Sequence, residues 1–104
     1  MVGQMDLDCL KGIDWEHPKL EQLEQFALEC VPGCRTHWES HNSSMSVCVE
    51  SGGQTAWLRP SLERDWQGNL EWVVFLDLSS LHSFVLRDSA SLEGELKDMF
   101  GGME

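Results

Sequence analysis

Basic residues are scarce in this sequence. Seven Lys and Arg stand against 18 Asp and Glu, so the formal net charge of the 104-residue chain is −11. Nucleic-acid binding depends largely on cations that displace counterions from phosphates, and a surface of this charge repels a polyanion. We therefore expect no direct binding to DNA or RNA, and no binding to an anionic membrane.

The sequence also lacks long apolar runs and linker-like stretches. It contains no window of about 18 uninterrupted apolar residues, so no transmembrane helix is expected. The first residues lack the basic and apolar regions of a secretion signal, which predicts a cytoplasmic protein whose four cysteines are free thiols. No Pro-, Gly- or Ser-rich stretch divides the chain, and we expect a single domain over residues 1–104.

No complete catalytic constellation is recognisable. Cys34 could pair with His37 as nucleophile and base, and Cys48 could pair with His82 across strands, but neither pair has a local signature. No Gly-rich turn that leads into a helix offers an oxyanion site. The many carboxylate pairs fall in segments that are expected to be exposed, whereas catalytic carboxylates usually need burial to shift their pKa. We therefore expect no enzymatic activity and no cofactor.

Two segments have the apolar spacing of helices. Pro18 suits a first helical turn, and the spacing predicts a helix from there to Cys30, which Val31-Pro32-Gly33 ends. Near the C-terminus, Asp88 or Ser89 is expected to cap a helix that ends at Gly101. Residues 1–16 have no strong period, and the sequence predicts a short strand or irregular arm there with Trp15 as its core anchor.

Between these helices the pattern predicts strands. They are expected over residues 45–50, 54–58, 70–78 and 81–87, with a loop over 59–68. The order of helix, four strands and helix predicts an α+β fold, in which an antiparallel sheet of about four strands carries an N-terminal and a C-terminal helix packed on one face. This arrangement would bring the two acidic ends of the chain to one side.

One local cluster has the residue types of a zinc site: Cys30, Cys34, His37 and His41. Zinc takes thiolate and imidazole ligands in a tetrahedron, but fingers usually separate the Cys pair from the His pair by about 12 residues. Here two residues separate them, and Cys30 lies on the apolar stripe of the first helix. These four residues are therefore candidates only, and we expect no metal.

The remaining signal is charge together with aromatic residues. The acidic residues of the two predicted helices are candidates for binding a partner: Glu21, Glu24, Glu29, Glu93, Glu95 and Asp98. Trp66 lies near two Arg residues, a combination that is typical of binding hot spots, although a large aromatic is more often buried. The alternative interpretation of the acidity is that it only keeps a Trp-rich domain soluble.

Three classes of function fit these observations. The first is a small acidic inhibitor that blocks a basic target by charge complementarity, as a toxin-immunity protein does or as a phage counter-defence protein (an anti-CRISPR) does by mimicking nucleic acid. Its target would be a nuclease or another nucleic-acid-binding complex. The second class is an adaptor or subunit that docks through a strand edge or helix face. The third is a small zinc-binding or Cys/His protein.

Overall fold

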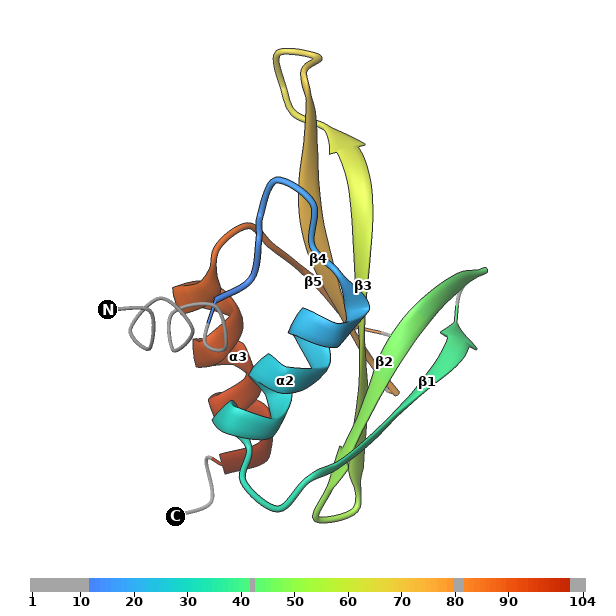
Figure 1. Cartoon of the computed structure of the whole chain (residues 1–104), viewed down its shortest axis with the longest axis vertical. Helices are drawn as coiled ribbons and strands as arrows, with labels where there is room; N and C mark the ends of the chain where they lie inside the picture. The colour runs from blue at the N-terminus through green and yellow to red at the C-terminus, as the bar shows by residue number, and fades with distance from the viewer. Residues whose placement is uncertain (1–11, 42, 80–81, 102–104) are drawn as a thin grey trace, which may run out of the picture.

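A computed structural model gives the fold and describes residues 12–41, 43–79 and 82–101. The elements follow in the order α2 (Leu20–Cys30), β1 (Arg35–His41), β2 (Ser44–Ser51), β3 (Gln54–Arg64), β4 (Leu70–Leu78), β5 (Ser83–Leu86) and α3 (Ser89–Gly101) (Figure 1). This order confirms the α+β class, with five strands where about four were expected. Most of the predicted N-terminal arm, including Cys9, lies outside the described residues, as do residues 80–81 between the last two strands.

The strands form one antiparallel meander in which each strand pairs with its neighbours in sequence. Helices α2 and α3 lie side by side over one face of this sheet, which is the arrangement that the sequence predicts (Figure 1). The core fills the space between the two layers. Its completely buried members come from both helices and from alternate positions of the central strands: Leu23, Ala27, Val47, Val49, Ala56, Leu58, Val74, Leu92 and Leu96. Burial of each Leu or Val stabilises the fold by about 1.5–3 kcal/mol.

The sequence does not predict strand β1, because apolar and polar residues do not alternate along it. Between Arg35 and His41 only Trp38 is large and apolar. The strand nevertheless pairs with β2 over its whole length, from Arg35 opposite Glu50 to His41 opposite Ser44. Because β1 is an edge strand, it contributes little to the core and needs few apolar side chains.

Strand β3 is longer than predicted: the prediction of a loop over residues 59–68 is wrong for 59–64, which belong to the strand, and is confirmed only for the turn at 65–68. The strand continues to Arg64 and pairs with β4 as far as Arg64 opposite Leu70. Pro60 is tolerated inside the strand because the ladder between β2 and β3 stops at Leu58, so no neighbour on that side needs its missing N–H. Beyond this point β3 and β4 continue as a two-stranded arm, residues 61–72, which projects from the rest of the sheet (Figure 1).

The last helix begins as predicted. The Asp88 carboxylate accepts a hydrogen bond from the Ser91 N–H at 2.7 Å, and this bond lowers the pKa of Asp88. Trp15 is half-buried, and its indole N–H donates to the Ser89 hydroxyl at 2.9 Å, which fastens the segment before α2 to the start of α3. Among the described residues, no helix has the length and apolarity that spanning a membrane requires.

The sheet curls around the face that the helices leave uncovered, which we call the concave face. His41 of β1 lies 3.7 Å from Asp77 of β4, although two strands separate them in the sheet. In a flat sheet these strands would be roughly 14 Å apart. The curl explains why Cys48 and Asp77, which point away from the helices, are only 1% and 3% exposed.

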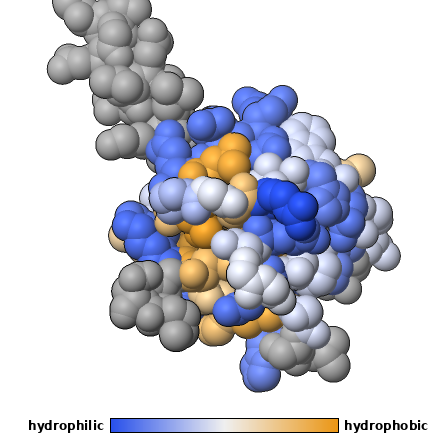
Figure 2. Space-filling model, turned by 90° about the horizontal axis from the view of Figure 1, so that it is seen from below, coloured by the Kyte–Doolittle hydropathy of each residue, from blue (hydrophilic) through white to orange (hydrophobic). Residues whose placement is uncertain are grey.

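On the helix side, part of the apolar core is exposed to solvent. Seen from below, apolar residues form a band with hydrophilic residues on either side of it (Figure 2). Several side chains are only half-buried against the core, among them Met99 and Phe100 at the end of α3. The polar surface is therefore interrupted by apolar area on this side of the molecule.

Candidate functional site

The six predicted partner-binding carboxylates all lie on α2 and α3, but they do not form one cluster. Glu29 and Glu93 line the same hollow between the two helices. Glu95 and Asp98 line a different hollow, between α3 and strands β4 and β5. The helix layer therefore presents carboxylates in more than one place.

Two of these carboxylates are engaged in contacts within the fold. Glu24 accepts hydrogen bonds from the Thr36 hydroxyl at 2.6 Å and from the Trp38 indole at 3.1 Å. Glu93 forms an ion pair with Lys97, one turn further along α3, at 2.6 Å, and this contact raises the pKa of Lys97. Glu21 is exposed at the start of α2.

Trp66 lies at the tip of the arm and is 90% exposed, so it is not a core residue. A well-defined turn carries it. The Gly68 N–H donates to the Asp65 carbonyl at 2.9 Å, and the Asp65 carboxylate accepts from the N–H groups of Gln67 and Asn69, each at 2.9 Å. Gly68 has φ +90°, a conformation that suits glycine. The turn thus displays an indole at the end of a hydrogen-bonded hairpin.

Further apolar side chains are exposed along and beside the arm. Leu62 and Leu70 are 46% and 56% exposed on its two strands. At the base of the arm a groove of about 500 Å³ is lined by Trp38, Met45, Pro60 and Trp72 together with residues 17–21. Trp38 and Met45 are each about half exposed, at 44% and 51%. Contiguous apolar surface of this kind is typical of binding sites.

The concave face has a different character, with a chain of polar and aromatic contacts. The Trp57 indole of β3 reaches across β2 and donates to Glu39 of β1 at 2.6 Å. The same indole stacks on the His41 ring, with centroids 4.1 Å apart and planes 2° apart. Glu39 also lies 2.8 Å from His37 Nε2, and the bonds from Trp57 and His37 hold the pKa of Glu39 below its ordinary value.

Asp77 of β4 lies on the same face, 3.7 Å from His41. It accepts hydrogen bonds from Arg59 at 2.8 Å and from Ser83 at 2.6 Å. Burial alone would raise its pKa, but the bonds from Ser83 and Arg59 outweigh burial, and the pKa is lowered. The Arg59 guanidinium also stacks over the Phe75 ring at 4.3 Å. Among the described residues, no buried side-chain nitrogen or oxygen lacks a hydrogen-bond partner.

The structure does not bring the four candidate zinc ligands together. Cys34 is buried in the core, where its thiol lies 3.8 Å from the Ala27 carbonyl, and Cys30 packs against the core from the end of α2. His37 and His41 point instead to the concave face, on the opposite side of the sheet. The two cysteines and the two histidines thus belong to separate environments.

The thiols of the three described cysteines are poorly suited to nucleophilic catalysis. Burial, and after it the neighbouring carboxylates, raise the pKa of Cys30 and of Cys48 to about 11. Burial also raises the pKa of Cys34. Because the thiolate is the reactive form, these thiols are largely unreactive at neutral pH.

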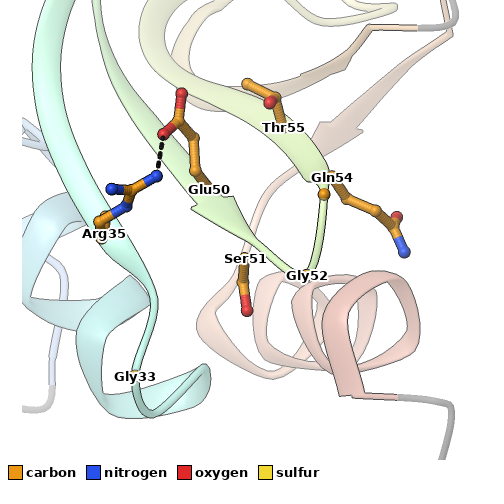
Figure 3. Close-up of a pocket in the computed structure, with 8 residues that line it drawn as sticks. Gly33, Arg35, Glu50, Ser51, Gly52, Gln54 and Thr55 are labelled. Atoms are coloured by element: carbon orange, nitrogen blue, oxygen red, sulfur yellow. Dashed lines mark ion pairs between the residues drawn. The ribbon is translucent and has the colours of Figure 1, made fainter.

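A further hollow lies where the β2–β3 turn approaches the start of β1. It measures about 310 Å³, and Arg35 and Glu50 form an ion pair of 3.6 Å at its side (Figure 3). The remaining lining comes from Gly33 and the turn residues 51–55. It offers neither a histidine nor a cysteine, and we assign no chemistry to it.

No protein-family model, no curated protein and no solved structure matches the chain. We therefore argue its function from the residues alone.

Sequence reasoning missed the concave face as a possible site because β1 was not predicted. One signal was available. His37, Glu39 and His41 alternate with other residues, and in a strand such positions share one face. No pattern in the sequence identifies Asp77 as their neighbour, because that contact depends on the curl of the sheet.

Proposed function

We propose that this protein acts by binding another protein, as a small acidic inhibitor of a basic target. The observation that carries the proposal is Trp66, which is 90% exposed at the tip of a hydrogen-bonded hairpin. Exposing an indole costs solubility and contributes nothing to the core. Rigid aromatic side chains are the commonest anchors of protein interfaces, because they bury a large area at low entropic cost.

The charge of the chain supports a basic partner. The net charge is −11, and the helix layer carries carboxylates on both of its helices. Glu21 lines the groove at the base of the arm directly. Complementary charge steers association and raises its rate, while the aromatic and aliphatic contacts determine how long the complex lasts. A nuclease or another nucleic-acid-binding protein has the basic surface that this combination fits.

The experiment begins with a pull-down from a nuclease-treated lysate of the source organism, at low and moderate salt. The retained partner is then purified, and its binding kinetics are measured with designed variants. Trp66→Ala should weaken binding at least tenfold through faster dissociation, since truncated hot spots cost about 2 kcal/mol or more. Gln67→Ala is the matched control in the same turn and should bind as the parent does. Equal binding by the two variants contradicts the role of the arm.

The charge component has its own test. We choose Glu21, Glu29 and Glu95 for substitution, because Glu24 and Glu93 form contacts within the fold and their replacement could change stability as well as charge. Replacing these three by Gln, and then by Lys, should slow association in two graded steps and flatten its salt dependence. Unchanged association rates would refute a charge-driven mechanism.

The second candidate is the adaptor class, and the apolar groove favours it. Trp38, Met45, Pro60 and Trp72 form a surface that a partner helix or strand could cover without any charge complementarity. Retention of an acidic partner that resists salt would support this candidate and exclude the inhibitor.

A further inference from the structure

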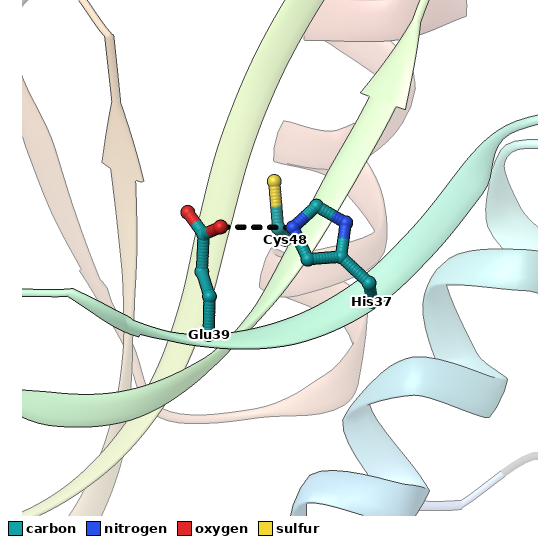
Figure 4. Close-up of side chains that lie close together, drawn as sticks. All are labelled: His37, Glu39 and Cys48. Carbon is teal, nitrogen blue, oxygen red and sulfur yellow. Dashed lines mark hydrogen bonds and ion pairs between the residues drawn. The ribbon is translucent and has the colours of Figure 1, made fainter.

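Three side chains of different chemistry converge on the concave face. His37 and Glu39 are two residues apart on β1, so they share a face, and Cys48 of β2 is the direct cross-strand partner of His37. Figure 4 shows the imidazole and the carboxylate on either side of the thiol. One nitrogen, one carboxylate oxygen and the sulfur all lie within 4.8 Å of one another.

This donor set fits zinc. Zinc binds thiolate, imidazole and carboxylate at about 2.0–2.3 Å, which places tetrahedral ligand atoms roughly 3.3–3.8 Å apart. His37 Nε2 and Glu39 Oε1 are 2.8 Å apart, so the two atoms must separate by roughly 0.5–1 Å, and side-chain rotation must bring them closer to the sulfur, by up to about 1.5 Å, to reach this spacing. The thiol disfavours magnesium and calcium, which take oxygen ligands.

Neighbouring side chains fix the orientation of the Glu39 carboxylate. The Trp57 indole donates to Glu39 Oε2 at 2.6 Å and leaves Oε1 on the side of His37. Stacking against His41 fixes the plane of the indole. Hydrogen bonds of this kind to the outer atom of a ligand are characteristic of protein metal sites, because they orient the ligand before the ion arrives.

The exposure of the three side chains and the charge of the ligands also suit a divalent metal ion. The side chains of His37 and Glu39 are 50% and 41% exposed, whereas Cys48 forms the floor and is 1% exposed. An ion can therefore enter from solvent and rest on a buried sulfur. The carboxylate and a thiolate carry two negative charges, which a divalent ion neutralises.

From this geometry we propose that His37, Glu39 and Cys48 bind one zinc ion, with water as the fourth ligand on the solvent side. On binding, the Cys48 thiol releases its proton to solvent and the sulfur becomes a thiolate ligand. The contact between His37 and Glu39 opens, the imidazole binds as its neutral Nδ1–H tautomer, so that Nε2 gives up its proton to solvent, and the nitrogen and the carboxylate each bond to the ion instead. The site does not depend on the proposed protein-binding function, which rests on the arm and the helix layer.

The test uses untagged, metal-stripped protein in which Cys9 is replaced by Ser, because Cys9 lies outside the described residues. Co²⁺ serves as the probe, since its bond to a thiolate gives a charge-transfer absorption in the near ultraviolet. We expect saturation at one equivalent and displacement of Co²⁺ by Zn²⁺. Cys48→Ser should abolish the charge-transfer band, while the matched control Cys30→Ser should keep it.

His37→Asn and Glu39→Gln keep the proposal testable if Cys48→Ser does not fold, because both residues are half exposed. Each should weaken Co²⁺ binding at least tenfold with an unchanged circular dichroism spectrum. Trp57→Phe removes the hydrogen bond to Glu39 and should weaken binding by about 10-fold or more. Absence of binding at millimolar Co²⁺, a charge-transfer band that survives in Cys48→Ser, or unchanged affinity in both His37→Asn and Glu39→Gln would each overturn the proposal.

Discussion

The most informative stability test is the substitution Asp77→Asn, which removes one charge and keeps the shape of the side chain. Asp77 is 3% exposed and accepts a hydrogen bond from Arg59, whose own side chain is 16% exposed. Removing one partner of a buried ion pair costs about 3–5 kcal/mol, because the other charge stays buried without compensation. Since Arg59 keeps some contact with solvent and with the Phe75 ring, we expect a loss of about 2–3 kcal/mol.

The stabilisation that Asp77 contributes should increase from acidic to neutral pH. The pKa of Asp77 is lower in the folded protein than its ordinary value of 3.8, so the folded state favours the ionised form. The stabilisation from this group is complete above the unfolded pKa and disappears as the pH falls through the folded pKa. The difference in stability between the parent and Asp77→Asn should therefore be largest near neutral pH and shrink below about pH 4.

Denaturant unfolding of both proteins between pH 3 and pH 7 measures this difference directly. At pH 7 the midpoint temperature of Asp77→Asn should also fall by roughly 10–15 °C. Glu63→Gln is the control, because Glu63 is an exposed carboxylate on the same strand as Arg59 and should change stability by less than about 0.5 kcal/mol. A loss below about 1 kcal/mol for Asp77→Asn, or a loss that does not change with pH, would refute the reasoning.

Two further substitutions test the fold. Asp88→Ala removes the cap of α3 and should cost about 1 kcal/mol in denaturant unfolding, with Asp98→Ala at the far end of the same helix as a control that costs less. Leu58→Ala should cost about 2–5 kcal/mol because Leu58 is completely buried, whereas Leu62→Ala on the same strand, at 46% exposure, should cost under about 1 kcal/mol; equal losses would mean that the core is not where the structure places it.

The elements that sequence reasoning predicted correctly are those in which local pattern and packing agree. The helix over Leu20–Cys30 has apolar positions at the spacing that its burial requires, and strand Leu70–Leu78 is a nearly continuous apolar run with buried residues toward its middle and end. The cap at Asp88 follows from the chemistry of one side chain and its neighbours. In these elements the local sequence is enough to predict the secondary structure, and contacts with distant parts of the chain need not be known.

The errors occur where a neighbour far away in the sequence decides the structure. A strand that contains Pro60 is possible only because β2 ends its ladder at Leu58, and that register is invisible locally. Likewise β1 is a strand because β2 offers it a partner, not because of its own composition. Trp66 is exposed because β3 is longer than predicted. The additional strand residues form the projecting arm, and Trp66 lies in the turn at its tip.

Two features of this molecule are not explained by the requirements of folding. Apolar residues on the concave face would be at least as stabilising as the ion pair of Asp77 and Arg59, because a buried pair loses the hydration of both charges. An indole at the tip of the arm stabilises nothing around it. Sequences tend to depart from their own folding rules at functional positions. The two departures occur on separate parts of the chain, and we propose a separate binding role for each part: zinc at His37, Glu39 and Cys48 on the concave face, and a partner protein at the arm.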